Sequence, residues 1–127
     1  MRKVVFVENS AKPIGPYSQA IISDNMVYTS GQLGVIPETS KLITDDFKTE
    51  AEQVMKNLSA VLEGAGSSMK NIVKITVLMQ DLGQFGIVND IFKEYFPENP
   101  PARSTYQVAG LPLGAKVEIE AIAMVKE

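Results

Sequence analysis

Apolar residues recur at steps of three and four positions along one long segment of the chain. This spacing predicts an amphipathic helix from about Asp45 to Glu63, with one buried stripe. Thr44–Asp46 supply candidate N-caps and negative charge at the helix start, and Gly64 and Gly66 mark its end. The stripe consists of Phe47, Ala51, Val54, Met55, Leu58, Val61, Leu62 and Ala65.

The same kind of spacing predicts a second helix from Leu82 to Phe96. Asp81 is its candidate cap, and Pro97 ends it because a helix rarely continues into a proline. The predicted buried stripe of this helix consists of Phe85, Val88, Phe92 and Tyr95.

Strands are predicted where β-branched runs or strict alternation replace the helical spacing. Ser23-Asp24-Asn25 close a predicted hairpin, and residues 11–16 and 31–44 are predicted loops. The predicted strands are Val4–Val7 (an edge strand), Gln19–Ile22, Met26–Ser30, Asn71–Met79, Arg103–Val108 and Lys116–Val125. Within Asn71–Met79, the residues predicted to face the helices are Val73, Ile75, Val77 and Met79.

The order of these elements is β-ββ-α-β-α-ββ, without a repeat or a linker. Helices separated by single strands indicate an α+β domain with a mixed sheet and both helices packed on one face. We expect one domain over residues 1–127.

The last predicted strand is apolar on one face and mixed on the other. The mixed face carries Lys116, Glu118 and Glu120 at one end, then Ile122 and Met124. Since a solvated face rarely holds such apolar residues on neighbouring strands, we predict that another subunit covers it.

Composition restricts the chemistry. The chain has no cysteine and no histidine, which excludes disulfides, thiol nucleophiles and Ser-His-Asp catalysis. We expect no metal and no cofactor. A net charge of −3 without a basic stripe argues against nucleic-acid binding. No apolar run is long enough to cross a membrane or to act as a signal peptide, so we expect a cytoplasmic protein.

Glu118 and Glu120 are the first candidates for proton transfer. They point to the same side of a strand, and one of them could act as a general base beside a cation in a sheltered place. Arg103 could be that cation if its strand pairs close by, because a guanidinium binds a carboxylate through two hydrogen bonds. A solvated strand end with a surface ion pair is the alternative.

Five short motifs resemble the RidA/YjgF family, in its order and at its spacings, and together they span nearly the whole chain. The motifs are Ile14-Gly15-Pro16-Tyr17-Ser18-Gln19-Ala20, Thr29-Ser30-Gly31-Gln32, Val88-Asn89, Pro101-Ala102-Arg103-Ser104 and Val117-Glu118-Ile119-Glu120-Ala121-Ile122-Ala123.

The resemblance implies a chorismate-mutase-like subunit in a homotrimer, with the sheets forming a central barrel and active sites between subunits. In such proteins the arginine matching Arg103 binds the substrate carboxylate, and the glutamate matching Glu118 orients or activates water. Backbone N–H groups near Gly31 and Thr105 help to hold the ligand, and many members have cysteine at the position of Thr105. Further residues matching cleft positions are Tyr17, Ser30 and Asn89.

The activity that the resemblance implies is hydrolysis of reactive 2-imino acids to 2-keto acids and ammonia. The C=N carbon is already electrophilic, so a positioned carboxylate suffices without histidine. A non-catalytic regulatory protein that binds a small molecule in the same cleft remains the alternative. An endoribonuclease, an activity attached to some relatives, is disfavoured by the acidic charge and the lack of histidine.

Overall fold

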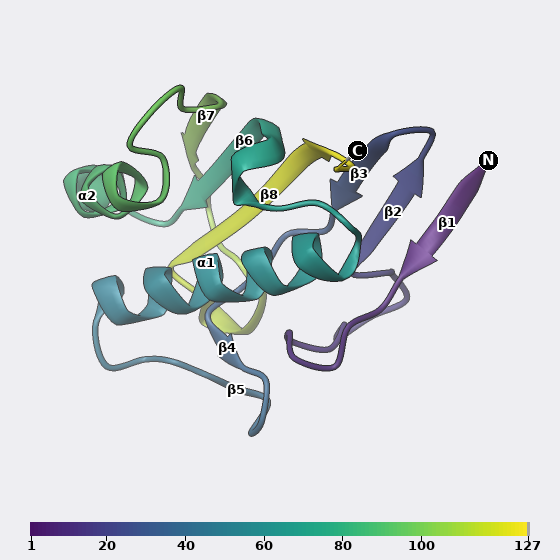
Figure 1. Cartoon of the computed structure of the whole chain (residues 1–127). Coiled ribbons are helices and arrows are strands. Elements are labelled where there is room, and N and C mark those ends of the chain that lie inside the picture. The colour runs from purple at the N-terminus through teal and green to yellow at the C-terminus, as the bar shows by residue number, and fades with distance from the viewer. Residues whose placement is uncertain (127) are drawn as a thin grey trace.

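A computed structural model describes residues 1–126 of the chain. Its centre is a six-stranded mixed sheet in the order β1-β2-β3-β8-β6-β7, and two helices cover one face of this sheet (Figure 1). The strands are β1 (Arg2–Val5), β2 (Ala20–Ser23), β3 (Met26–Thr29), β6 (Ile72–Met79), β7 (Ala102–Gln107) and β8 (Val117–Met124). No helix in this part of the chain is long and apolar enough to cross a membrane.

Helix α1 (Phe47–Gly64) packs along the centre of the sheet, and its predicted buried stripe is confirmed in full. Of the three cap candidates, Asp46 caps the helix: its carboxylate accepts the N–H of Thr49 at 2.8 Å. Two polar residues of α1, Glu50 and Asn57, are also buried. The helix therefore presents polar groups to its neighbours as well as apolar ones.

Helix α2 (Phe85–Tyr95) starts three residues later than predicted. Asp81 caps a preceding 3₁₀ turn, η2 (Leu82–Gln84), by accepting the N–H of Gly83. The prediction that Phe85 is buried is wrong, because Phe85 keeps 38% of its surface exposed while Ile91 is buried. Phe85 is the first residue of α2, whereas Val88 and Phe92 of the same predicted stripe lie further along the helix and are buried.

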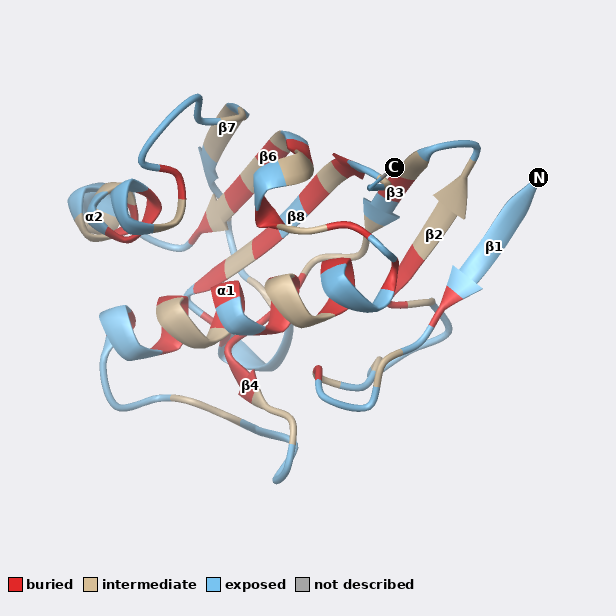
Figure 2. Cartoon of the chain, viewed as in Figure 1, coloured by how far each residue is buried: buried red, intermediate tan, exposed pale blue. Residues whose placement is uncertain are grey.

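Strand β6 contains a bulge that the alternation did not predict. The register against β8 shifts between Ile72 and Lys74, so Val73 is the extra residue. Val73 is exposed and Ile72 is buried instead, which corrects the prediction that Val73 faces the helices. Beyond the bulge, Ile75, Val77 and Met79 face the helices as predicted, giving the alternating burial along β6 in Figure 2.

The connections place β6 between β7 and β8. Strand β7 runs parallel to β6 at the edge of the sheet, and β8 runs antiparallel to β6 on its other side. Strand β1 forms the opposite edge, as predicted, although it ends at Val5. The loop predicted over residues 31–44 also holds a small two-stranded ladder of β4 (Val35–Ile36) and β5 (Lys41–Leu42).

The sheet face away from the helices is uncovered in one chain, and we call it the open face. It carries Glu118 and Glu120 beside the half-buried Leu78 and Ile122. The exposed apolar side chains on the open face are Val4, Tyr28, Tyr106 and Met124. The mixed character predicted for this face of β8 is therefore confirmed.

Candidate active site

Arg103 lies on β7 and points to the helix side of the sheet. It pairs with the buried Ile75, and its guanidinium carbon lies 4.9 Å from the ring centre of Phe85 and 5.2 Å from that of Phe92. No carboxylate within residues 1–126 lies close enough to form a salt bridge with Arg103. No acidic residue in the described part of the chain therefore engages the hydrogen-bond donors of this guanidinium.

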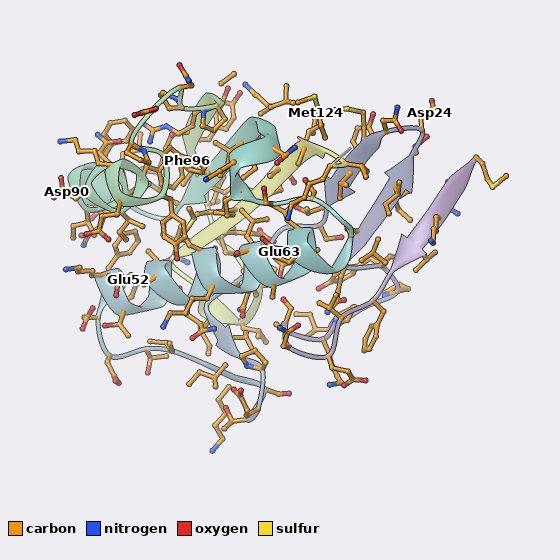
Figure 3. The ribbon with its side chains drawn as sticks, in the orientation of Figure 1. Asp24, Glu52, Glu63, Asp90, Phe96 and Met124 are labelled. Carbon is orange, nitrogen blue, oxygen red and sulfur yellow. The ribbon has the colours of Figure 1, made fainter. Side chains whose placement is uncertain are left out.

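A cavity of about 390 Å³ lies beside Arg103 and is large enough for a small ligand. Asn89 also lines it, so the structure brings together two of the predicted site residues. The cavity lining includes Phe96, which is labelled in Figure 3 and packs edge-on against Phe92 with ring centres 5.4 Å apart. The other lining residues are Phe92, Lys93, Pro100 and Pro101.

Thr105 follows Arg103 on the same face of β7, and its hydroxyl oxygen is buried with no hydrogen-bond partner among the described residues. The free side of β7 is the edge of the sheet. Val108 donates its N–H inward to Met79, so the alternation along a strand turns the N–H of Thr105 outward. Arg103, Thr105 and Asn89 form what we call the Arg103 half-site.

Glu118 lies on the open face near the start of β8, directly against Gly31. A Cβ atom added to Gly31 would lie only 2.6 Å from the carboxyl carbon of Glu118, so a larger residue at position 31 would displace this carboxylate. A pair of backbone hydrogen bonds between Gln32 and Ile119, at 2.8 and 3.1 Å, fixes this approach. Because Gly31 has no side chain, its loop can approach the Glu118 carboxylate this closely.

The environment of Glu118 favours the protonated carboxyl. Partial burial raises the pKa of Glu118, and the negative charge of the nearby Glu120 raises this pKa further. A carboxylate with a raised pKa is a stronger base than an ordinary glutamate, which suits proton transfer near neutral pH.

Ser30 and Tyr17 lie near Gly31. The hydroxyl of Ser30 donates to the carbonyl of Ser18, and the hydroxyl of Tyr17 accepts the N–H of Ile14 at 3.3 Å. Tyr17 and Gly31 line a common small hollow, and Tyr17 is about half exposed. Glu118, Gly31, Ser30 and Tyr17 form what we call the Glu118 half-site.

The two half-sites do not meet within one chain. Arg103 points to the helix side of the sheet and Glu118 to the open face, and β6 separates their strands. The condition for pairing Arg103 with Glu118, that their strands lie close together, is not met within one chain, because the crossover through α2 places β7 at the edge of the sheet beyond β6. Each chain thus carries two incomplete sets of groups.

Three buried polar side chains that the sequence analysis did not single out support the Glu118 half-site. Asn57 donates to the carbonyls of Leu33 and Val35 at 2.9 and 2.8 Å, and Glu50 accepts the N–H of Lys116 at 2.8 Å. Gln19 holds the segment before the hairpin, because its side-chain amide bonds to the backbone of Val7 and Ala11. A polar residue at the start of a strand is too common for the sequence alone to indicate this role.

Glu50, a second acid near the Glu118 half-site, also has a raised pKa. Desolvation raises the pKa of Glu50, although the backbone N–H of Lys116 and the charge of Lys116 oppose this rise. The sequence offered a signal for Glu50 and Asn57, since both interrupt the apolar surface of α1 at positions where a solvated residue would not fit.

Comparisons with known proteins agree on one family. A family model described as Endoribonuclease L-PSP matches residues 7–125. The chain is 48% identical to Reactive Intermediate Deaminase A, chloroplastic, of Arabidopsis thaliana over 96% of its own length and 65% of that protein. It is 44% identical to the 2-iminobutanoate/2-iminopropanoate deaminase of Homo sapiens over 98% of its own length and 90% of the human protein.

Solved structures give the same result. The crystal structure of RidA from the Antarctic bacterium Psychrobacter is 41% identical, with a TM-score of 0.93 over 97% of this chain and 99% of that one. The structure of E. coli TdcF with bound serine is 38% identical, with a TM-score of 0.92 over 98% and 99% of the two chains. From the family model and these identities, the chain belongs to the RidA/YjgF family.

Proposed function

We propose that this protein is a hydrolytic deaminase that converts 2-imino acids to 2-keto acids and ammonia. The observation that carries the proposal is the pair of complementary half-sites: a guanidinium without an acidic partner among residues 1–126, and a carboxylate with a raised pKa held against Gly31. An electrophile that carries a carboxylate needs both groups, because the guanidinium binds the carboxylate and the base activates the attacking water. The names of the Arabidopsis and human relatives support the same activity.

The proposed reaction has two steps. Glu118 removes a proton from water as the water oxygen bonds to the carbon of the protonated imine, which gives a neutral carbinolamine. Glu118 then returns this proton to the nitrogen and is ionised again, the C–N bond breaks as ammonia leaves, and the carbinolamine hydroxyl loses its proton to water as the C=O bond of the keto acid forms. A general base of this kind contributes about 10²–10⁴-fold in rate, or about 3–5 kcal/mol of barrier.

The remaining residues bind and orient the substrate in this proposal. Arg103 binds the substrate carboxylate through two parallel hydrogen bonds, and the outward N–H of Thr105 lies on the same strand to assist. Gly31 contributes a backbone N–H on the side of Glu118, while Tyr17, Ser30 and Asn89 line the cleft. Holding the carboxylate fixes the distance between the C=N carbon and the attacking water.

We also propose that the active protein is a homotrimer with a central barrel formed by the sheets. Support comes from the open face, where four large apolar side chains stay exposed: Val4, Tyr28, Tyr106 and Met124. A second copy that covers this face would also bring the Arg103 half-site of one chain to the Glu118 half-site of the next.

The test is an assay in which an amino-acid oxidase generates the imine and loss of the imine is followed. Arg103→Ala and Glu118→Ala should each remove most of the acceleration without unfolding the protein. Lys41→Ala and Glu63→Ala are the matched controls, because both side chains are exposed and lie outside the half-sites; Glu63 lies toward the end of α1 (Figure 3). Wild-type turnover in the Glu118 variant would remove that residue from the mechanism.

A non-catalytic binder would use the same half-sites and remains the second candidate. It would bind 2-ketobutyrate at Arg103 but give no acceleration of imine loss, so calorimetry together with the coupled assay separates the two functions. The E. coli structure with bound serine favours a small carboxylate as the ligand in either case.

The description of the family model raises ribonuclease activity as a third possibility. We propose that nucleic acid is not a partner, because the chain is acidic and has no histidine. Nuclease activity that co-purifies with the protein and disappears in Arg103→Ala would contradict this. We further propose that the protein works in the cytoplasm, which cell fractionation tests.

A further inference from the structure

The guanidinium of Arg103 lies over two aromatic rings from α2, those of Phe85 and Phe92. Its carbon is within about 5 Å of both ring centres, at 4.9 Å from Phe85 and 5.2 Å from Phe92. Both distances are in the range where the negative face of a ring attracts a cation. These rings are the partners that the structure gives the charge of Arg103, since no acidic residue among the described ones pairs with it.

Aromatic partners leave a guanidinium free to bind a ligand, whereas a carboxylate partner does not. The N–H groups of a guanidinium lie in its plane and point outward, while stacking on a ring uses the face of that plane. An internal salt bridge would occupy the same N–H groups that a ligand carboxylate needs. The two rings can therefore fix the orientation of Arg103 without competing with the substrate.

The two rings differ in how they are held. Phe92 is buried and packs edge-on against Phe96, with ring centres 5.4 Å apart and an interplanar angle of 77°. Phe85 stands at the start of α2 and keeps 38% of its surface exposed, outside the core that Val88 and Ile91 fill. Core packing accounts for Phe92 but leaves Phe85 without a role in the fold.

We propose that Phe85 is a positioning residue that holds the Arg103 guanidinium in the orientation that binds the substrate carboxylate. The proposal rests on the proposed function, in that the ligand of Arg103 is a carboxylate. It assigns Phe85 no contact with the reacting atoms. Loss of the ring should therefore weaken substrate binding while leaving the chemical step nearly unchanged.

The first experiment replaces the ring. Phe85→Leu should raise KM for the imine and Kd for 2-ketobutyrate by about three- to tenfold, the range expected for one cation–π contact, with kcat changed less than about twofold. Phe85→Tyr keeps the aromatic face and should restore both values. Phe6→Leu is the matched control, because Phe6 is also exposed and lies at the other end of the sheet.

The second experiment separates electrostatics from packing. Phenylalanine carrying one, two and three fluorine atoms is placed at position 85, which weakens the negative face of the ring with little change in size. A cation–π role predicts that Kd for 2-ketobutyrate rises steadily with each fluorine. A flat series would show that the ring only packs. Tighter binding would show that the ring faces the anion itself, and either result overturns the proposal.

The Arg103→Ala variant distinguishes this proposal from the proposed function. If Arg103→Ala binds 2-ketobutyrate as tightly as the wild type, the carboxylate site at Arg103 is wrong and both proposals fail. If Arg103→Ala loses binding while the fluorinated series stays flat, the carboxylate site stands and only the role of Phe85 fails.

Discussion

Two carboxyl groups on one strand, Glu118 and Glu120, differ in their surroundings, because Glu118 is half-buried against Gly31 whereas Glu120 is exposed. Burial and the charge of Glu120 both raise the pKa of Glu118, and burial is the larger cause. In the proposed mechanism Glu118 acts in its ionised form. Activity should therefore fall as the pH decreases through this raised pKa, at a higher pH than for an ordinary glutamate.

Replacing Glu120 by Gln should move the acidic limb of the pH–rate profile to lower pH. The variant removes the negative charge that disfavours ionisation of Glu118, but burial remains, so the limb should stay above the range of a free glutamate. The measurement is kcat/KM against pH, with spontaneous hydrolysis subtracted. Glu98→Gln should leave the profile unchanged, and a limb that moves to higher pH after Glu120→Gln would contradict the assignment.

Thr105 offers a second prediction at this scale. Since its buried hydroxyl has no partner among the described residues, Thr105→Val should raise the free energy of unfolding by about 1 kcal/mol. Binding of 2-ketobutyrate should change less than about twofold, because the proposed contact uses the backbone N–H. Chemical denaturation and calorimetry measure the two quantities, with Thr105→Ser as the control. Destabilisation by valine would mean that the hydroxyl has a partner in the assembly.

At the scale of elements, α1 positions the Glu118 half-site through buried polar side chains. Asn57 is 1% exposed and donates to two carbonyls of the segment that follows Gly31. Asn57→Ala leaves both carbonyls without a partner and should lower the free energy of unfolding by about 2–3 kcal/mol. Denaturation in urea tests this. Gln53→Ala, which removes a neighbouring but less buried amide, should cost less than half as much.

The helices show what local pattern predicts and what it does not. All eight residues of the α1 stripe follow from spacing, because a helix that packs on a sheet buries one continuous face. The spacing failed at Phe85, where a 3₁₀ turn precedes the helix, and at Val73, where a bulge interrupts the alternation. Both irregularities depend on partners in the fold that local spacing does not encode.

The motifs predict a set of candidate site residues but not how the fold arranges them. The motifs identified Arg103 and Glu118, whereas the order β8-β6-β7 that separates them results from a crossover through α2. Phe85 was missed as a partner of Arg103 because nothing in its helical spacing distinguishes a ring over a cation from a ring in the core.

For the whole molecule, the proposed mechanism requires two chains, because the two half-sites do not meet within one chain. The Arg103 half-site and the Glu118 half-site lie on opposite faces of the same sheet. A second copy on the open face would bury its exposed apolar side chains and supply the missing half-site in one contact. In the proposed trimer, catalysis therefore depends on assembly.

Mixing two inactive variants tests this claim most directly. Arg103→Ala and Glu118→Ala are unfolded together in equal amounts and refolded, and formation of mixed oligomers is verified by native mass spectrometry. A site shared between copies should recover about one quarter of wild-type activity, since random mixing leaves both groups intact in that fraction of sites. Mixed oligomers that stay inactive would contradict the shared site.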